Sequence, residues 1–336
     1  MINLFRNRGK NKGSPTYFIL FGSGLVVVGI FGFFIGAGLG FLRFIFQLHG
    51  EMRLFIEQII WYSAMPLVFG FILIFAEFIF IVRRKRLYKK LVNERPKNNA
   101  ITVLLTAYND EKSIGAAVKD FKKHPLVKRV VVVSNNSTDD TIKVAKAAGA
   151  IVYNEKKQGY GPCVFRCILE SLRYKDTNLI CLAEGDRTFR AYDLDKFLPY
   201  TCHAEVVSGT RIVEQLQENR NQLSMFMHYG NYFVAKLLEF KYTGEATLSD
   251  VGSTYKVIKR KTLLKLVGKL NFNINHEFNA HFLETVMKNG HSLLECPITF
   301  HPRVGLSKGA NQSNLKSTIV GLRMIIGIFF GWKTIK

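Results

Sequence analysis

Two long apolar stretches stand near the start of the chain. Residues 17–42 carry no formal charge, and residues 56–82 form a second apolar run that contains Pro66 and Glu77. At about 1.5 Å of rise per residue, a helix of either length crosses a hydrocarbon core of about 30 Å. Glycines are frequent in the first run, and glycine allows membrane helices to approach closely. The pattern predicts two transmembrane helices, with Glu77 paired or reaching the membrane surface.

From residue 100 onward, short apolar runs alternate with amphipathic segments. The apolar runs predict strands at residues 101–105, 129–133, 150–153 and 179–183. The amphipathic segments predict helices at residues 113–123, 139–148 and 161–174. Ser113 is a suitable N-cap for the first of these helices. Such alternation with short connections is typical of an α/β domain with a doubly wound, mostly parallel sheet and helices on both faces.

Basic segments flank the apolar pair on both sides. Residues 1–16 and residues 83–99 are rich in Lys and Arg, whereas the connection between the two apolar runs is nearly neutral. The positive-inside rule places both basic segments in the cytoplasm, so that residues 17–82 form a transmembrane hairpin. The second basic segment, a juxtamembrane linker, also suits anionic lipid headgroups. The domain at residues 100–309 and both chain termini are therefore expected on the cytoplasmic side.

The final segment, residues 310–336, contains a further apolar stretch. This stretch, residues 318–332, is interrupted by Arg323 and is short for a membrane span. We expect an amphipathic helix that lies in the plane of the membrane interface. A helix that packs into the core of the preceding domain is the alternative.

The charge balance narrows the class of partner. Among 336 residues, 47 Lys and Arg face 25 Asp and Glu, a formal net charge of +22. So basic a chain favours nucleic acid, a phosphorylated substrate or an anionic membrane surface. Nucleic acid is the weakest of these, because the sequence has no zinc-ligand spacing, no aromatic-basic RNA motif and no helix-turn-helix pattern. Five scattered cysteines without a C-x-x-C motif indicate free thiols in a reducing compartment.

Four polar segments directly follow the predicted strands, at residues 106–111, 134–141, 155–161 and 184–189. The carboxyl ends of parallel strands meet at one edge of a sheet, where α/β proteins bind ligands. Glu184 and Asp186 end a buried strand in the fourth segment, and such a pair suits Mg²⁺ or Mn²⁺ bound to a diphosphate. In the third segment two lysines and Gly159 precede a helix N-terminus, which suits phosphate.

The order and spacing of these motifs resemble the A-type fold of inverting family 2 glycosyltransferases. The similar motifs are T-A-Y-N-D-E (106–111), V-S-N-N-S-T-D-D-T (133–141), Q-G-Y-G (158–161) and the acid-x-acid triplet 184–186. The likeness continues in S-G-T-R (208–211), D-V-G-S-T-Y (250–255) and R-V-G-L-S-K (303–308). It covers about residues 101–309 and is greatest for polyprenyl-phosphate glycosyltransferases of the dolichol-phosphate mannosyltransferase kind.

The resemblance implies roles for the matching residues. Binding of the donor nucleotide-sugar falls to Thr106, Tyr108, Asn109, Asp110, Ser134, Asn135, Gly159, Glu184 and Asp186. Of these, Glu184 and Asp186 would hold Mg²⁺ or Mn²⁺, and Asp186 is an expected catalytic residue. The acceptor phosphate would be contacted by Arg211, Arg303 and Lys308. A hydroxyl acceptor would instead need a carboxylate base, for which Asp250 is the candidate catalytic residue and Glu277 the second choice.

Several positions depart from the family's usual residues. Thr106 stands where proline is usual, and Asp110 where glutamate is usual. The pair 134–135, Ser-Asn, replaces two acidic residues, which leaves the identity of the bound base open. Glu184 replaces the first aspartate of the metal motif and is one methylene longer. Metal binding is therefore expected to depend mainly on Asp186.

The resemblance implies a membrane-anchored, hexosyltransferase-type enzyme. It would move a sugar from a nucleotide-sugar to a polyprenyl (dolichyl or undecaprenyl) phosphate on the cytosolic face, with inversion at the anomeric carbon. A phosphate monoester has its second pKa near ~6 and is largely ionised at neutral pH, so this acceptor needs no strong base.

Two alternatives remain open. The first is a non-processive transferase onto a lipid-linked sugar hydroxyl in glycolipid or cell-surface polysaccharide synthesis. The second is an inactive, membrane-anchored scaffold that binds sugar nucleotides. A processive polysaccharide synthase is disfavoured, because the sequence has no Q-x-x-R-W segment and two spans are few for a channel. A homo-oligomer is compatible with the sequence.

Overall fold

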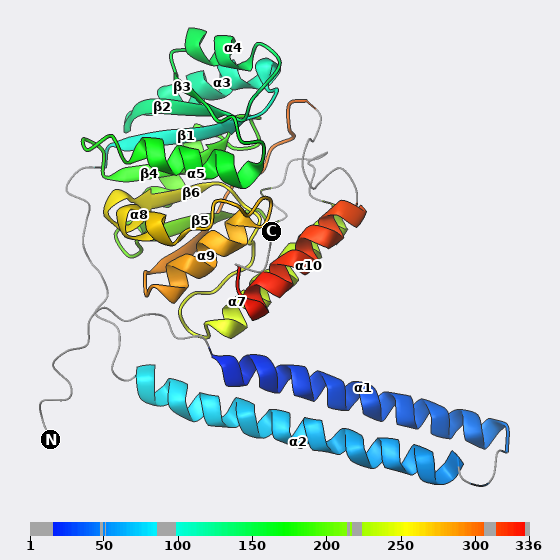
Figure 1. Cartoon of the computed structure of the whole chain (residues 1–336). Helices are drawn as coiled ribbons and strands as arrows, with labels where there is room; N and C mark the ends of the chain where they lie inside the picture. Colours follow the sequence, from blue (N-terminus) through cyan, green and yellow to red (C-terminus); the bar gives the residue numbers. More distant parts are fainter. Residues whose placement is uncertain are drawn as a thin grey trace, which may run out of the picture. The chain divides into compact units, whose positions relative to one another are not determined.

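The computed structural model describes residues 16–47, 50, 52–85, 99–213, 216, 224–305 and 314–332. The chain divides into two compact units. One unit is a pair of N-terminal helices, and the other is built around a β-sheet (Figure 1).

The N-terminal unit consists of the antiparallel helices α1 (Tyr17–Ile45) and α2 (Met52–Lys85). Both are long and apolar enough to cross a membrane, which confirms the two long helices predicted from the sequence. A Cβ atom added to Gly22 would lie 2.7 Å from the carbonyl oxygen of Gly70, and one added to Gly70 would lie 2.5 Å from that of Gly22. Glycine at both positions therefore allows the two backbones to touch.

Glu77 of α2 is paired within this helical unit. Its side chain is buried, and Oε2 accepts a hydrogen bond of 3.3 Å from the backbone amide of Phe18. Phe18 lies in the first turn of α1, where backbone amides have no partner inside the helix. The carboxylate thus satisfies an amide at the positive end of the helix dipole, as the expectation of a paired Glu77 requires.

The larger unit holds, within the described residues, one seven-stranded sheet in the order β3-β2-β1-β4-β6-β5-β7. The strands are β1 (Ile101–Ala107), β2 (Val127–Ser134), β3 (Ile151–Asn154), β4 (Leu179–Glu184), β5 (Val206–Thr210), β6 (Lys256–Lys259) and β7 (Leu293–Pro297). All neighbours run parallel except β6, which is antiparallel to β4 and β5. The predicted mostly parallel sheet is confirmed. The first residues of β6 lie at the edge where its neighbours end.

Apolar side chains alternate along the central strands and face two separate cores. Val103 and Leu105 of β1 face one core, and Leu104 faces the other, as the two-residue period of a strand requires. The first core is covered by α3 (Glu111–Lys122), α4 (Thr141–Ala147) and α6 (Leu194–Tyr200). The second is covered by α5 (Tyr160–Ser171), α7 (Met225–Lys241), α8 (Arg260–Leu266), α9 (Phe278–Lys288) and α10 (Asn314–Phe330). Helices cover both faces of the sheet, as predicted.

Helix α3 begins earlier than the sequence indicates. It starts at Glu111, so the predicted N-cap, Ser113, lies inside the helix. The neighbouring loop explains the difference. The amide of Asp110 donates to Oγ1 of Thr141 (2.7 Å), and the amide of Glu111 donates to Oδ2 of Asp139 (3.2 Å). Side chains 31 and 28 residues further along thus satisfy these amides, and no local pattern reveals such a contact.

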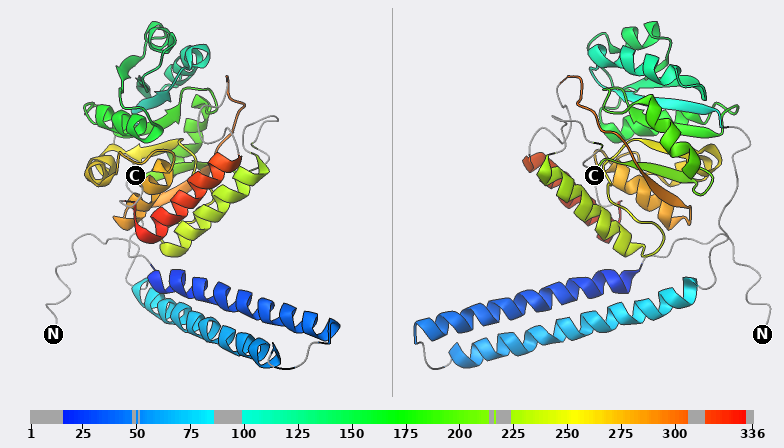
Figure 2. Two further views of the ribbon diagram at one scale, coloured as in Figure 1. Left: turned by 45° about the vertical axis from the view of Figure 1, so that its right-hand side comes forward. Right: turned by 180° about the vertical axis from the view of Figure 1, so that it is seen from behind.

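A buried polar cluster binds α10 to the sheet unit. Glu284 of α9 accepts hydrogen bonds from Nζ of Lys241 (2.6 Å), the hydroxyl of Tyr242 (2.9 Å) and the indole of Trp332 (2.5 Å). Lys241 also donates to the carbonyl of Ile328 near the end of α10. Figure 2 shows α10 and α7 side by side in both views. One face of α10 is therefore part of the core, as in the alternative considered for the final segment.

Candidate active site

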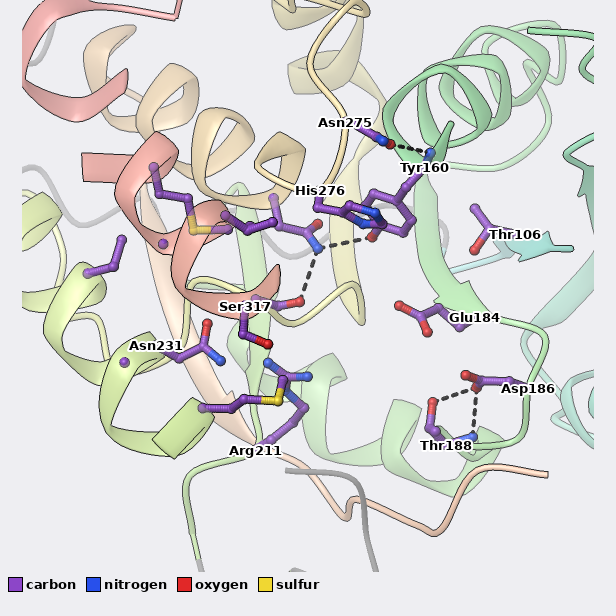
Figure 3. A pocket seen from close by; sticks show the side chains of 18 of the residues that line it. Thr106, Tyr160, Glu184, Asp186, Thr188, Arg211, Asn231, Asn275, His276 and Ser317 are labelled. Carbon is purple, nitrogen blue, oxygen red and sulfur yellow. Dashed lines mark hydrogen bonds between the residues drawn. The ribbon is translucent and has the colours of Figure 1, made fainter. Parts of the chain in front are cut away.

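A cavity of about 550 Å³ opens at the carboxyl ends of β1 and β4, and α5, α7 and α10 contribute to its wall (Figure 3). Most of the residues predicted to bind substrate line it, namely Thr106, Tyr108, Asp110, Asn135, Gly159, Glu184, Asp186, Arg211 and Arg303. They come from loops far apart in the sequence. Because these loops follow neighbouring strands, the edge of the sheet brings them together.

Other predicted residues lie elsewhere. Lys308 lies outside the described residues. Asn109 and Ser134, both described, do not line the cavity and brace the loops behind it. Asn109 has a φ of +50° and accepts a hydrogen bond of 2.8 Å from the amide of Thr138. The hydroxyl of Ser134 donates to that of Ser137 (2.8 Å), which also accepts from the amide of Asn109 (3.0 Å). These contacts hold the loop after β1 against the loop after β2.

Asp186 lines the cavity although its side chain is buried, with only 1% of its surface exposed. Its Oδ1 accepts two hydrogen bonds from Thr188, one from the amide (3.0 Å) and one from the hydroxyl (2.6 Å). Its Oδ2 lies 3.3 Å from Nη1 of Arg303. Burial, followed by the charge of Glu184, raises the pKa of Asp186 to about 6 against the opposing effect of Arg303. The ionised carboxylate is thus costly here, and a bound cation would offset that cost.

Glu184 is anchored through one oxygen. Its Oε1 accepts a hydrogen bond of 2.7 Å from the hydroxyl of Thr254, whereas Oε2 accepts none from the described residues. Figure 3 shows the carboxylates of Glu184 and Asp186 at the same edge of the cavity.

The two carboxylates fit a divalent cation such as Mg²⁺ or Mn²⁺, because hard cations prefer oxygen ligands. Anchoring one oxygen of each carboxylate fixes the orientation of the other. Among the described residues, no group of three or more His, Cys, Asp or Glu side chains could hold a metal. Oxygens of a diphosphate or of water would complete the coordination, which suits a site for a metal–nucleotide complex.

Arg303, which follows β7, bridges two carboxylates of the site. Its Nη1 lies 3.3 Å from Oδ2 of Asp186, and its Nη2 lies 3.4 Å from Oδ1 of Asp110. Asp110 also accepts a hydrogen bond of 2.9 Å from the amide of Tyr108. The guanidinium therefore links the loop after β1, where a base is expected, with the loop after β4, where a diphosphate is expected.

Arg211 and Asp250 form a buried, bidentate ion pair. Nε of Arg211 lies 2.7 Å from Oδ2 of Asp250, and Nη2 lies 2.8 Å from Oδ1. Burial would raise the pKa of Asp250, but the charge and hydrogen bonds of Arg211 outweigh it and lower that pKa. Asp250 does not line the cavity, although Arg211 does. A carboxylate with both oxygens bonded and a lowered pKa is a weak base, and its contacts serve to orient Arg211.

Asn135 joins the loop after β2 to the start of α5. Its Oδ1 accepts from the amide of Gly159 (2.8 Å), and its Nδ2 donates to the carbonyl of Lys157 (2.8 Å). Gly159 has a φ of +137°, which side-chain-bearing residues rarely adopt. A Cβ atom on Gly161 would lie 1.7 Å from the carbonyl oxygen of Ile274. The Q-G-Y-G motif thus packs the start of α5 closely against the segment that precedes α9.

Several cavity residues were not predicted from the sequence. Tyr160 comes from α5, His276 from the loop before α9 and Asn279 from the first turn of α9. Asn231 and Ser317 come from α7 and α10. Figure 3 shows all of these around the cavity except Asn279, which it does not label. Tyr160 lies within Q-G-Y-G, so a motif marked its segment without giving it a role. No motif marks α7 or α10.

Comparison with known proteins places the chain in a family. Residues 102–266 match the family "Glycosyl transferase family 2". A dolichyl-phosphate hexose transferase of Haloferax volcanii is 26% identical over 209 residues, which span 62% of this chain and 86% of that protein. Protein RfbJ of Shigella flexneri is 31% identical over 124 residues, which span 36% of this chain and 89% of that protein.

A solved structure has the same fold. Glucosyl-3-phosphoglycerate synthase from Mycobacterium tuberculosis, in complex with Mn²⁺, uridine diphosphate and phosphoglyceric acid, is similar with a TM-score of 0.50 and 16% identity. The match spans 68% of this chain and 78% of that chain. The sheet, the motifs at its edge and the family match agree, and the chain belongs to glycosyl transferase family 2.

Proposed function

We propose that this glycosyltransferase moves a hexose from a nucleoside diphosphate sugar to a polyprenyl phosphate at the membrane surface, with inversion at the anomeric carbon. One observation carries the proposal: the cavity has a charged end and an apolar end. The charged end contains Glu184, Asp186, Arg211 and Arg303. The apolar wall is formed by α7 and α10 through Phe226, Phe233, Val320, Met324 and Ile325. A polyprenyl phosphate likewise has one charged end and one apolar end, so it matches the two ends of the cavity.

The donor would lie over the loops after β1, β2 and β4. Tyr108 offers a ring for the base, and Asn135 and Gly159 line the same part of the cavity. Glu184 and Asp186 would hold Mg²⁺ or Mn²⁺ against the diphosphate. The bound ion would neutralise charge that grows on the departing nucleoside diphosphate. The two carboxylates are oriented by hydrogen bonds from Thr254 and Thr188, so they need little rearrangement when the donor binds.

The acceptor phosphate would be bound by Arg211 and Arg303, together with Lys308. Its oxygen attacks the anomeric carbon from the face opposite the leaving diphosphate, which inverts the configuration. A phosphate monoester ionises with a second pKa near ~6, so no strong base is required. This agrees with the engagement of Asp250 by Arg211. The name of the Haloferax volcanii relative, a dolichyl-phosphate hexose transferase, supports the same class of acceptor.

A lipid-linked sugar hydroxyl as acceptor is the second candidate. It would need a base within hydrogen-bond reach. The two candidate bases, Asp250 and Glu277, do not line the cavity, and Oε1 of Glu277 lies 3.8 Å from Nη1 of Arg323. The phosphate acceptor is therefore favoured. An inactive scaffold is a third candidate, which the retained pair Glu184 and Asp186 disfavours.

A panel of donors tests the proposal directly. Membranes that contain the full chain are incubated with polyprenyl phosphate and labelled UDP-, GDP- and dTDP-hexoses. We expect one donor to give a labelled lipid whose sugar is released by mild acid, because a glycosyl phosphate is acid-labile. An acid-stable lipid product would identify a hydroxyl acceptor. Binding of a donor without transfer from any of them would support the scaffold.

The outer faces of α7 and α10 support a position at the membrane surface. Large apolar side chains that do not line the cavity are exposed on both helices, namely Met225, Tyr229, Tyr232 and Phe240 on α7, and Leu315, Ile319, Ile326 and Phe330 on α10. So large an exposed apolar surface is unusual in a soluble protein. We propose that it lies in the membrane interface, with the apolar part of the cavity toward the lipid. The basic segments that flank α1 and α2 favour a two-span anchor with the sheet unit and both termini in the cytoplasm.

Charges on this face are expected to block transfer to a lipid in a bilayer. The variant Met225→Glu/Tyr229→Glu should lower transfer to long-chain polyprenyl phosphate in vesicles about tenfold or more, because burying glutamate at the interface is costly. Transfer to a short-chain acceptor dissolved in detergent should change little. Leu264→Glu, on the exposed surface of α8, is the matched control and should affect neither reaction. Equal losses with both acceptors would argue against a membrane-facing role.

A further inference from the structure

A buried lysine lies beneath the carboxylate of Glu184. Lys256 is the first residue of β6 and is 1% exposed. It pairs with Leu182 of β4 in the antiparallel register. Because β6 runs opposite to its neighbours, the residues just before it, including Thr254, lie at the edge of the sheet where β4 ends in Glu184. The reversed strand thus brings Lys256 and Thr254 below the site.

A chain of hydrogen bonds joins Lys256 to Glu184. Nζ of Lys256 donates to Oδ1 of Asn279 (3.1 Å) and to the carbonyl of Ser253. Nδ2 of Asn279 donates to the hydroxyl of Tyr160 (3.0 Å) and lies 3.4 Å from Oγ1 of Thr254. The hydroxyls of Tyr160 and Thr254 are hydrogen-bonded to each other. The chain ends where Oγ1 of Thr254 donates to Oε1 of Glu184 (2.7 Å).

The donor and acceptor groups of these side chains allow only one direction for this series of hydrogen bonds, from Lys256 toward Glu184. In its charged form Lys256 only donates, so the oxygen of the Asn279 amide faces it and the NH₂ faces away. The carboxylate of Glu184 only accepts, so the single proton of the Thr254 hydroxyl is given to it. The hydroxyl of Tyr160, which accepts from the NH₂ of Asn279, is therefore the donor in its contact with Thr254. Each group thus donates toward the carboxylate, and reversing any one of them would leave two donors or two acceptors facing each other.

Glutamate at position 184 has particular need of such an anchor. It has one more rotatable bond than aspartate, so fixing its carboxylate costs more side-chain entropy. The hydrogen bond from Thr254 fixes Oε1, which sets the direction of Oε2. Burial lowers the pKa of Lys256 to about 7, against the charges of Asp250, Glu184 and Glu295. A buried ammonium is costly, and packing alone would be satisfied by an apolar side chain of the same length.

We propose that Lys256, Asn279, Tyr160 and Thr254 are positioning residues that orient Glu184 for the cation–diphosphate complex. This inference rests on the proposed function, because it takes Glu184 as a cation ligand. The chain explains how glutamate serves at this position although its side chain is longer than that of aspartate. Lys256 acts through four successive hydrogen bonds and touches no substrate.

The test measures binding of Mn²⁺ alone to the full chain purified in detergent, with free Mn²⁺ followed by electron paramagnetic resonance. Thr254→Val keeps the shape of the side chain and removes the donor to Glu184. We expect it to weaken Mn²⁺ binding about tenfold, as for loss of a hydrogen bond to a charged group. Thr262→Val is the matched control, because Thr262 is also buried and donates to a carboxylate, Oε1 of Glu205 (2.9 Å), away from the site.

A double-mutant cycle distinguishes positioning from general damage. Glu184→Gln should itself weaken Mn²⁺ binding, and adding Thr254→Val to it should have little further effect if Thr254 acts through Glu184. Lys256→Met should weaken binding in the same direction, again without addition to Thr254→Val. Should Lys256→Met fail to fold, the double-mutant cycle between Thr254 and Glu184 still tests whether Thr254 acts by orienting Glu184.

Two results would overturn the inference while leaving the cation site intact. One is unchanged Mn²⁺ binding by Thr254→Val when Glu184→Gln and Asp186→Asn both lose it. The other is additive loss in the double variant, which would show that Thr254 acts elsewhere. If neither Glu184→Gln nor Asp186→Asn alters Mn²⁺ binding, the proposed cation site is wrong, and the inference fails with it.

Discussion

Replacing Asp186 with asparagine is expected to lower the rate of sugar transfer about 10³-fold or more. Asparagine has the same shape, and its oxygen can still accept the hydrogen bonds from Thr188. It lacks the negative charge that would hold a cation against the departing diphosphate, and that stabilisation is among the largest contributions to such reactions. Transfer of label from the active donor to lipid measures the effect.

The same variant is expected to fold as well as the unsubstituted protein. Burial raises the pKa of Asp186, so its ionised form opposes folding, and the neutral amide removes that cost. The amide NH₂ would face Nη1 of Arg303, which lies 3.3 Å from Oδ2 of Asp186, so the two effects oppose each other and the unfolding temperature at neutral pH should change little. Asp195→Asn is the control, because Asp195 is exposed and contacts His124 away from the cavity. Normal transfer by Asp186→Asn would refute the role given to this carboxylate.

Replacing Arg303 with methionine is expected to have opposite effects on transfer and on cation binding. Transfer should fall about 10²–10³-fold, because a guanidinium that stabilises phosphate charge is lost. Binding of Mn²⁺ alone should become about tenfold tighter, because Nη1 lies 3.3 Å from Oδ2 of Asp186 and the two cations compete for this oxygen. Arg303→Lys keeps the positive charge but loses the two-pronged geometry of the guanidinium. Its transfer rate and its Mn²⁺ affinity should lie between those of the unsubstituted protein and Arg303→Met.

Arg173→Met is the control for the loss of an arginine. Arg173 pairs with Glu170 at the end of α5, and its side chain is 65% exposed. It should alter neither transfer nor Mn²⁺ binding. Parallel losses of transfer and of Mn²⁺ binding in Arg303→Met would contradict competition, since they would mean that Arg303 supports the cation site.

The first half of the sheet unit was predictable because its strands are continuous apolar runs followed by polar loops. Residues 101–105 and 179–183 lie within β1 and β4, and the polar loops after them line the cavity. The later strands gave no such pattern. Three of the five residues of β7, Leu293–Pro297, are not fully buried, and β6 has only four residues. The reversal of β6 depends on its partners in the sheet and not on its own sequence.

The motif residues of the site were predictable, but their partners were not. Asp250 and Arg211 are 39 residues apart, and only the fold shows that they form an ion pair. This contact changes the role expected for Asp250. The sequence made its carboxyl group a candidate base, whereas the fold engages it in the ion pair with Arg211. The contribution of α7 and α10 to the cavity was hidden for a similar reason. The Glu284 cluster that holds α10 in place joins residues up to 87 positions apart.

The attachment of α10 to α7 and α9 also sets an order of events during synthesis of the protein. The hairpin helices end at Lys85, whereas α10, which supplies one wall of the cavity, ends at Phe330. At about 5–20 residues per second, the ribosome needs roughly 10–50 s to make the intervening chain. The apolar hairpin is therefore available for insertion into a bilayer long before the cavity is complete. Under the proposed function, the nascent chain would reach the membrane first and would form the cavity for a lipid substrate there.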